Sequence, residues 1–461
     1  MKRMESCKRV NLCALGGGGE VGANCFELSF GGHQILLDCG THPKKEGECS
    51  LPAFDLLTRA PEAYIITHGH VDHCGAVPYL ARMHPGVHGY ATLPTGRIMD
   101  RMLHNSVSVM ETIAKERGIA EYPLFEHSDV GYALRFLETF NYREPFYLRT
   151  PDPVEVQFIE AGHVLGAASV LIRLPGHTIF YTGDICRRRQ ALMGGYKPLD
   201  KDTQVDTLII ESTQGAANDE TYRTYIEEIE HLGDAVRGVL MGGGSVLIPS
   251  FALGRTQEMV NILADLQERG IIPTVPIYTA GLGRAIYELY DKFSDHLQPH
   301  AVLRPLEQFE RLGDVWNPAV VERLLRRSCI VVATSGMMIE NTPSALIAQQ
   351  MVQQSHHGIF FVGYLDADTL GYKLLNAPAG TPLQYELNRP FVAKVLENVR
   401  QFRFSAHATR SELAAVVERV KPKNVVYIHG DPEALDWMER NTGDGRETFV
   451  PAVGQTITLE A

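Results

Sequence analysis

Four histidine and aspartate side chains, all potential metal ligands, fall within the stretch Thr67-His68-Gly69-His70-Val71-Asp72-His73-Cys74-Gly75. The stretch directly follows the apolar run 63–66, which has the composition of a buried strand. If it forms the loop that leaves this strand, its first two histidines can turn to one side while Asp72 and His73 reach a second point nearby. Imidazole and carboxylate groups bind borderline cations such as Zn²⁺, so the spacing predicts two metal ions close together. A histidine-rich surface turn is the disfavoured alternative, because the motif stands at the end of a strand.

Length and composition predict a globular protein. At 461 residues, 44% of them hydrophobic, the chain suffices for about two to four domains with apolar cores. Residues 1–20 contain no apolar stretch of signal-peptide length, and no run approaches the roughly 18 apolar residues of a membrane span. We therefore expect a soluble, cytoplasmic protein without a membrane partner.

The net charge of −12 argues against non-specific binding to duplex nucleic acid, because phosphate binding relies on Lys and Arg. It does not exclude a nuclease. Basic residues and metal charges can be confined to a cleft while the outer surface is acidic, since the local field and the net charge are separate quantities.

Short strands are predicted before the metal-binding stretch. Residues 9–15, 24–30 and 33–38 have strand-like composition, and the third strand ends at Asp38. Residues 17–22 match G-x-G-x-x-G, but a strand and not a helix follows, so we reject a dinucleotide site. Glycine there is better explained by tight turns that need a positive φ close to the metal site.

Further candidate ligands follow later strands. Residues 76–140 are predicted to be mostly helical, with one helix over 128–139. Strand-like runs then lead to His163 and to Asp184, each of which is framed by glycine. Near the C-terminus, His407 precedes a run of helical period and His429 ends a strand. Either of these two could by itself be an ordinary core histidine.

The pattern between these regions differs. From residue 207 a strand ends at Glu211, and strands and helices then alternate, with short glycine or proline turns, to about residue 364. This alternation predicts parallel strands covered by helices, a doubly wound α/β domain.

These motifs, in this order, resemble the metallo-β-lactamase superfamily. The H-x-H-x-D-H motif, His163 and Asp184 match its ligand motifs. Glu211, His407 and His429 match motifs A, B and C of the β-CASP subgroup of nucleases. Four further runs also resemble that subgroup, so that the resemblance covers essentially the whole chain: 249–255, 335–338, 361–364 and 369–371.

The resemblance implies an α/β fold in two parts. A four-layered αββα metallo-β-lactamase domain would comprise residues 1–213 and 398–461, and a doubly wound α/β β-CASP domain, residues 214–397, would be inserted into it. The active site is expected in the cleft between them.

The resemblance also implies the ligands of two Zn²⁺ ions, with Mn²⁺ as the alternative metal, and a hydroxide that bridges them as the nucleophile. Asp38 would support the ligands from behind. His407, oriented by Glu211, would be the general acid. The expected ligands are His68, His70 and His163 for the first ion, Asp72, His73 and His429 for the second, and Asp184 for both.

The implied substrate is RNA, most simply single-stranded, cut to 5′-phosphate and 3′-hydroxyl products. His429 supports RNA because the DNA-repair branch has valine at this motif. Since the chain ends soon after it, we expect no separate RNA-binding module. Arg255, at a predicted helix start, is either a phosphate contact or a surface salt-bridge residue. Ser335, Gly336 and Ser405 are the other candidate substrate contacts.

Several alternatives stay open. Gln214 and Thr409 depart from the family pattern, which puts local substrate contacts in doubt but removes no ligand. The other candidate functions are a hydrolase of a small ester or thioester and a catalytically idle RNA-binding subunit. The sequence decides neither endonuclease against 5′-exonuclease action nor the oligomeric state.

The eight cysteines show no C-x-x-C spacing, which argues against a disulfide framework or a cysteine zinc site. Cys39, Cys74 and Cys186 lie within two residues of candidate site residues. They either line the site or pack as small hydrophobic side chains, and packing is the favoured interpretation.

Overall fold

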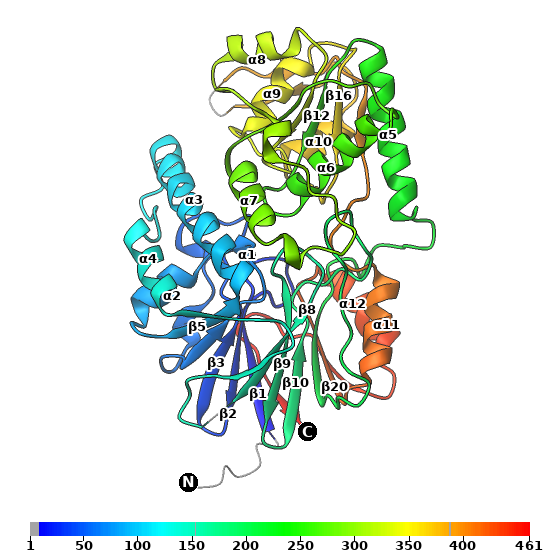
Figure 1. The fold of residues 1–461 in the computed structure, drawn as a ribbon. Helices are drawn as coiled ribbons and strands as arrows, with labels where there is room; N and C mark the ends of the chain where they lie inside the picture. The colour runs from blue at the N-terminus through cyan, green and yellow to red at the C-terminus, as the bar shows by residue number, and fades with distance from the viewer. Residues whose placement is uncertain (1–8, 153, 387–388) are drawn as a thin grey trace. The chain divides into compact units, whose positions relative to one another are not determined.

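A computed structural model describes residues 9–152, 154–386 and 389–461 (Figure 1). Its contacts divide the chain into two compact units. The first unit comprises 1–189, 194–221 and 407–461, and the second comprises 190–193 and 222–406. The sequence-based boundaries were 213/214 and 397/398. The second unit extends past 397 because a strand at 399–401 completes its sheet.

The described part of the first unit contains two seven-stranded sheets. Sheet 1 runs in the order β22-β1-β2-β3-β4-β5-β6, and sheet 2 in the order β21-β20-β11-β10-β9-β8-β7. The strands of sheet 1 are β1 (Arg9–Gly16), β2 (Cys25–Phe30), β3 (His33–Leu37), β4 (Ala63–Ile65), β5 (His88–Thr92), β6 (Leu137–Phe140) and β22 (Thr456–Glu460). Those of sheet 2 are β7 (Pro145–Tyr147), β8 (Glu155–Glu160), β9 (Ala168–Leu174), β10 (His177–Tyr181), β11 (Thr207–Glu211), β20 (Asn424–Ile428) and β21 (Glu447–Phe449).

Alternating side chains of the strands build two cores in this unit. Ile35 and Leu37 of β3 join Val170 of β9 and Ile209 of β11 in the core between the sheets. Leu36 points the other way and packs in a second core with residues of α2, α3 and α4. Strands buried on both faces therefore read as continuous apolar runs in the sequence.

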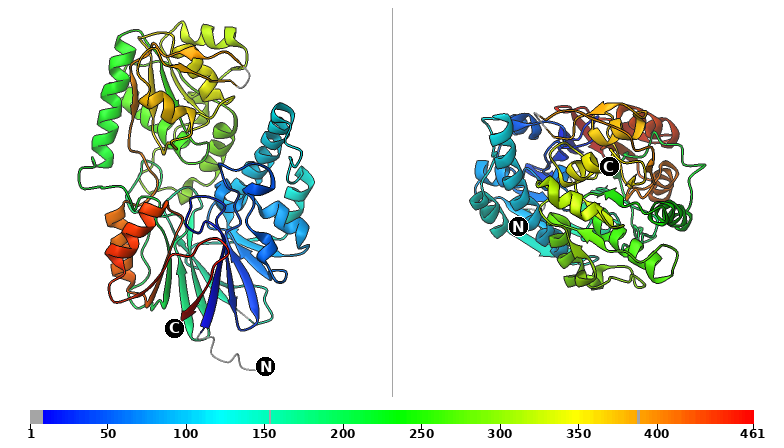
Figure 2. Two further views of the ribbon diagram at one scale, coloured as in Figure 1. Left: turned by 180° about the vertical axis from the view of Figure 1, so that it is seen from behind. Right: turned by 90° about the horizontal axis from the view of Figure 1, so that it is seen from above.

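Helices cover the outer faces of the two sheets. In Figure 1 and in the rear view of Figure 2, α2–α4 and α11–α12 lie on opposite outer sides of the paired sheets. The arrangement confirms the four-layered αββα architecture expected from the sequence. The helices of this unit are α1 (Val71–Cys74), α2 (Val77–Met83), α3 (Leu93–Arg117), α4 (His127–Arg135), α11 (Arg410–Val420) and α12 (Pro432–Thr442).

One predicted helix is too long. The expectation of a helix over 128–139 is wrong beyond Arg135, where the chain enters β6. Gly89–Thr92 of β5 pair in parallel with Leu137–Phe140, and this pairing overrides the helical period of the sequence. Tertiary context, which a local pattern does not contain, decides the element here.

The second unit is built on a six-stranded parallel sheet in the order β14-β13-β15-β12-β16-β19. Val246 and Ile248 of β12 face a core with α5 and α6, whereas Leu247 faces a core with α9 and α10. Helices on both faces of a parallel sheet confirm the doubly wound α/β expectation.

The strands of the second unit are β12 (Val246–Pro249), β13 (Ile277–Thr279), β14 (Glu310–Arg311), β15 (Ile330–Ala333), β16 (Gly358–Phe361) and β19 (Val399–Gln401), with a separate pair formed by β17 (Pro382–Leu383) and β18 (Val392–Ala393). Its helices are α5 (Tyr225–Met241), α6 (Arg255–Glu268), α7 (Gly281–Lys292), α8 (Pro318–Leu325), α9 (Pro343–Met351) and α10 (Leu370–Asn376). Among the described helices of the whole chain, none combines the length and the apolar character needed to cross a bilayer.

A buried histidine of the second unit predicts a pH-dependent stability. His357 is 1% exposed, and its Nδ1 accepts a hydrogen bond from the Ser245 amide at 3.0 Å, which requires a neutral ring. Burial, with a smaller effect of His356, lowers the pKa of His357 to about 4. The unfolded chain therefore takes up this proton first as the pH falls, and stability is lost between about pH 6.5 and 4, with a slope of up to about 1.4 kcal/mol per pH unit.

We expect His357→Asn, which keeps an acceptor near the position of Nδ1 but does not titrate, to show a weaker loss of stability over this range. Urea unfolding midpoints at pH 7 and pH 4.5 for both proteins measure the difference. The same loss in both proteins would show that His357 does not supply this pH dependence.

Candidate metal centre

The site is built where strands end. Asp38 follows β3, the histidine-rich stretch follows β4, and Asp184 follows β10. The site residues of the later part of the chain also stand at the carboxyl ends of strands. Strands β10, β11 and β20 are parallel neighbours, so their carboxyl ends meet at one edge of sheet 2. This shared edge explains why residues far apart in the sequence come together: His163 follows β8, Glu211 ends β11 and His429 follows β20.

The histidine-rich stretch packs tightly against Asn24, which precedes β2, and against the segment that follows β3. The amide of Asn24 donates to the carbonyl of Asp72 at 2.8 Å, and the amide of Cys39 donates to that of His73 at 2.8 Å. A Cβ at Gly40 would lie 1.8 Å from the Asp72 carbonyl oxygen, so only glycine fits there. Part of the stretch is a helical turn, α1, which begins directly after His70.

The first ligand group consists of three histidines. His70 Nδ1 lies 3.0 Å from His68 Nε2 and 3.2 Å from His163 Nε2. His68 and His163 are buried and His70 is half-buried. The nitrogen atoms of all three lie within 4.8 Å of one another, close enough to share one cation.

The second ligand group contains a carboxylate. His429 Nε2 lies 3.5 Å from Asp72 Oδ2, and His73 Nε2 lies 3.8 Å from the same oxygen. Asp184 stands next to both groups. Its Oδ2 is 3.7 Å from both His68 Nε2 and His163 Nε2 and 3.4 Å from His73 Nε2, and its Oδ1 is 3.1 Å from His429 Nδ1.

Asp38 holds the ligands from behind. Its carboxylate accepts hydrogen bonds from His73 Nδ1 at 2.8 Å, from the Thr67 amide at 2.8 Å and from the Tyr181 hydroxyl at 2.5 Å. The bond to Nδ1 fixes the tautomer of His73 and leaves the lone pair of Nε2 directed toward Asp72 and Asp184. The sequence identified Asp38 but missed Tyr181, a strand tyrosine that no local motif marks.

Two site residues have unusual backbones. Asp38 and His429 adopt positive φ angles of 57° and 49°. A non-glycine residue in this region costs roughly 1–3 kcal/mol and persists where the surroundings impose it. Both stand directly after strands, and the turn directs their side chains into the cluster.

The donor set fits metal ions. Among the described residues, Asp184 Oδ1 and His429 Nε2 are buried without a properly formed hydrogen bond. Placing five imidazoles and two carboxylates, most of them buried, this close together is costly unless cations complete the charge balance. Nitrogen and carboxylate ligands of this kind suit Zn²⁺. The cluster is therefore a candidate metal site.

The charges of the cluster reinforce this conclusion. Burial alone would raise the pKa of Asp184, but attraction to His429 and His73 holds it well below the usual range, so the carboxylate stays ionised. Burial, followed by repulsion from His73, lowers the pKa of His68 well below its ordinary value. Asp184 and His68 are therefore in the forms that bind metal. Burial would lower the pKa of His73 and of His429, but the charge of Asp184 raises both, so a cation would have to displace their protons.

His407 and Glu211 form a pair beside the cluster. His407 Nδ1 lies 2.9 Å from Glu211 Oε2, and His407 Nε2 lies 4.0 Å from Asp184 Oδ2. The other oxygen of Glu211 accepts from the Ile185 amide at 2.7 Å, which fixes the carboxylate. Burial would lower the pKa of His407, but the charges of Glu211 and Asp184 raise it. The His407 side chain is 20% exposed, so a reactant can reach the ring.

The remaining candidates belong to the second unit. Ser335 Oγ accepts from the Ile339 amide at 2.9 Å, and its carbonyl accepts from Ser344 Oγ at 2.8 Å. A Cβ at Gly336 would lie 2.9 Å from Phe251, so packing explains this glycine. Ser405 is half-buried. The proposed contacts of Ser335, Gly336 and Ser405 with substrate stay predictions.

Arg255 is buried, whereas the sequence suggested either a phosphate contact or a surface salt-bridge residue. Its guanidinium donates to the carbonyl of Phe404 at 2.8 Å and to Gln190 Oε1. The residue stands at the first turn of α6, where the segments 190–193 and 402–404 pass, and these segments cover it. This geometry favours a structural role over a phosphate contact.

We therefore expect Arg255→Ala to lower the free energy of unfolding by about 1–3 kcal/mol, because buried acceptors lose their donor. Urea unfolding measures the loss. Arg269→Ala is the matched control, since this arginine at the end of α6 forms an exposed ion pair with Asp265 and should cost less than about 1 kcal/mol. Unchanged stability together with a raised KM for RNA would restore the phosphate-contact interpretation.

The cysteines near the cluster are packing residues in this structure. Cys39, Cys74 and Cys186 are buried, and burial raises the pKa of the thiols of Cys39 and Cys74. Such thiols are poor metal ligands and nucleophiles. Cys7 lies outside the described residues.

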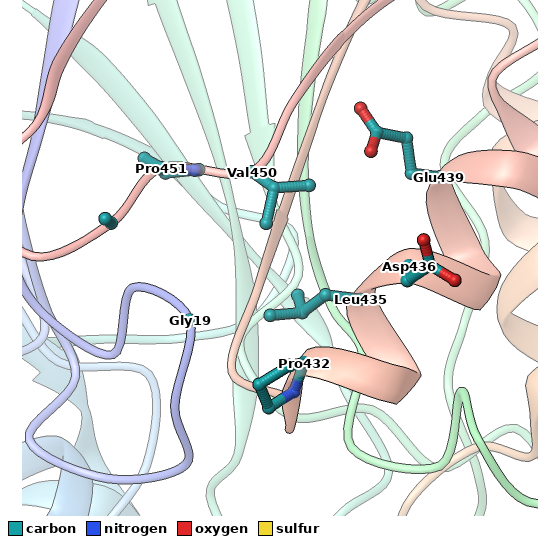
Figure 3. Close-up of a pocket in the computed structure, with 8 residues that line it drawn as sticks. Gly19, Pro432, Leu435, Asp436, Glu439, Val450 and Pro451 are labelled. Atoms are coloured by element: carbon teal, nitrogen blue, oxygen red, sulfur yellow. The ribbon is translucent and has the colours of Figure 1, made fainter.

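The cavity in Figure 3 is distinct from the cluster. It has a volume of about 300 Å³ and lies between α12 and residues 450–452, with Asp436 and Glu439 on one side. None of its lining residues is a candidate metal ligand. The cavity therefore does not mark the site of the proposed chemistry.

Comparisons with known proteins cover almost the whole chain. The metallo-β-lactamase superfamily model matches residues 18–217, the β-CASP domain matches 256–374, and the Zn-dependent metallo-hydrolase RNA specificity domain matches 392–451. A crystal structure of a protein of unknown function from Enterococcus faecalis V583 superposes with a TM-score of 0.59 over 98% of this chain and 100% of that chain. At 15% identity, it supports the fold alone.

Curated relatives match nearly the whole of this chain, but the share of each relative that the match covers differs. Cleavage and polyadenylation specificity factor subunit 3-II of Arabidopsis thaliana is 30% identical over 98% of this chain and 72% of that protein. The RNase J-like protein of Methanocaldococcus jannaschii is 29% identical over 90% and 91%, respectively. The chain spans only 54% of the similar subunit 3 of Dictyostelium discoideum, which is 29% identical over 94% of this chain. The chain belongs to the β-CASP group of the metallo-β-lactamase superfamily.

Proposed function

We propose that the chain is a metal-dependent ribonuclease that hydrolyses phosphodiester bonds of single-stranded RNA in RNA processing or decay. One observation carries the proposal: a cluster of histidines and aspartates suited to two cations adjoins a hydrogen-bonded His407–Glu211 pair suited to proton transfer. The names of the relatives, which include an RNase J-like protein and an endoribonuclease, support RNA as the substrate. Other relatives are named as subunits of factors, which supports protein partners as well.

In this proposal each residue has the role that the family resemblance implied. Asp184, which lies within 4 Å of histidines of both ligand groups, would hold both cations. Bound Zn²⁺ or Mn²⁺ would lower the pKa of water, supply a nucleophile at neutral pH and stabilise charge on the phosphate. The ligands would be His68, His70 and His163 for one cation and Asp72, His73 and His429 for the other.

His407 is proposed to protonate the departing 3′-oxygen, which is a poor leaving group without a proton. Glu211 accepts the hydrogen bond of His407 Nδ1 and so orients Nε2 for this transfer. Asp38, through His73, keeps the ligands in place. Loss of the 3′-oxygen as a hydroxyl on the upstream fragment leaves the phosphate on the 5′ end of the downstream fragment.

The experiment compares labelled single-stranded RNA, DNA of the same sequence and a chromogenic ester, each with metal-loaded protein and after chelation. We expect metal-dependent cleavage of RNA in preference to the other two substrates. Hydrolysis of the ester alone would favour the small-ester alternative, and binding of RNA without cleavage would favour the idle subunit. With 5′-labelled RNA, release of mononucleotides indicates exonuclease action and discrete fragments indicate internal cutting.

A further inference from the structure

One run of three consecutive cationic residues, Arg187-Arg188-Arg189, occurs in this chain of net charge −12. It begins three residues after Asp184, so the Arg187 Cα lies within about 11 Å of the Asp184 Cα. The distance would reach about 11 Å only if residues 184–187 were fully extended. The backbone of this cationic run thus begins close to the candidate metal site of an otherwise acidic protein.

The backbone before this run is fixed against the elements that carry the site residues. The Cys186 amide donates to the carbonyl of Ala161 at 3.0 Å, next to Gly162 and His163. The Ala408 amide donates to the carbonyl of Ile185 at 2.6 Å, directly after His407. The run therefore starts from a position held between the strand end that bears His163 and the segment that bears His407.

The side chains differ in their surroundings. Arg188 is half-buried, whereas Arg187 and Arg189 are exposed, and neither of these two forms an ion pair or hydrogen bond with another described residue. Most other arginines of the first unit have a carboxylate partner, such as Arg143 with Glu160 at 2.8 Å. Unpaired cationic side chains beside one another repel, and an anion relieves that repulsion.

We propose that Arg187 and Arg189 bind backbone phosphates of the RNA strand next to the bond that is cut. The inference rests on the proposed function and names a phosphate-binding track on the first unit. Guanidinium groups bind phosphate through paired, charge-assisted hydrogen bonds, and this contact carries no base specificity. The track supplies cationic contacts where the net charge of the chain would repel RNA.

The test measures binding of a fluorescent single-stranded RNA as a function of salt concentration. Metal-loaded His407→Ala protein is the common background, because slow cleavage keeps the RNA intact. In that background Arg187→Ala/Arg189→Ala should weaken binding roughly tenfold or more at low salt. It should also reduce the slope of log K against log salt by about 1.4, that is, about 0.7 for each lost phosphate contact.

Two further variants make the result specific. Arg187→Lys/Arg189→Lys keeps the charges and should restore most of the slope, which a merely structural role would not predict. Arg326→Ala/Arg327→Ala removes an exposed adjacent pair from the second unit and should leave the slope unchanged. An unchanged slope in Arg187→Ala/Arg189→Ala, or weaker binding that lysine does not rescue, would overturn the proposal.

The failure of the proposed function would be visible separately. If wild-type protein binds RNA but does not cleave it with metal present, the nuclease assignment is wrong. The change in salt slope still decides whether the arginines bind phosphate, because it is an equilibrium measurement that requires no cleavage.

Discussion

Asp184→Asn is expected to abolish RNA hydrolysis and to lower metal content at both positions of the cluster. Asp184 lies within 4 Å of nitrogen atoms from His68, His163 and His73, and it also contacts His429. Asparagine keeps the shape but removes the charge that the proposed cations need. Metal analysis of purified protein and a rate measurement with labelled RNA check the two expectations together.

The matched control is Asp200→Asn in the same unit. The side chain of Asp200 is 90% exposed, so this change removes one charge without touching the cluster. We expect native metal content and native activity. Full activity in Asp184→Asn would contradict the two-cation account, and lost activity with unchanged metal content would limit Asp184 to a role in the reaction itself.

The second large effect separates proton donation from metal binding. His407→Ala should keep its metal and slow RNA cleavage by roughly 10²–10⁴-fold, the usual contribution of a positioned proton donor. His429→Ala should instead lose metal, because both ring nitrogens of His429 face carboxylates of the cluster. His300→Ala, an exposed histidine of the second unit, should change neither property.

A substrate with sulfur in place of the bridging 3′-oxygen gives the sharper test, because a thiolate departs without protonation. We expect wild type and His407→Ala to cut this substrate at similar rates, while wild type cuts normal RNA far faster. Since His407 also stands within reach of Asp184 and His163, its loss could act through the metal. If His407→Ala is equally impaired on both substrates, His407 acts through the metal and not as the proton donor. The proposed role of Glu211 in orienting His407 would then also be wrong.

Much of the candidate site could be predicted because its residues stand at strand ends. His68 to His73 are neighbours in sequence, so their spacing alone indicates a metal site. His163 and Asp184 each follow a strand that the apolar pattern reveals. The ends of parallel strands meet at one edge of a sheet, which is why such residues converge.

Other features depend on contacts that a local pattern does not contain. Tyr181 reaches Asp38 across 143 positions of sequence, and only the packing of the two sheets brings them together. The burial of Arg255 depends on Gln190 and Phe404, which come from two distant segments. Strand β19, which moves the boundary of the second unit, is too short for periodicity to reveal.

The most direct test of the account is RNA cleavage in water enriched in ¹⁸O, followed by mass analysis of the product ends. The account predicts 5′-phosphate and 3′-hydroxyl ends, with one ¹⁸O atom in the 5′-phosphate after a single turnover, and no reaction after chelation. A 2′,3′-cyclic phosphate or a 3′-phosphate end would show that the 2′-hydroxyl attacks or that the opposite bond breaks, and either result would contradict hydrolysis at this cluster.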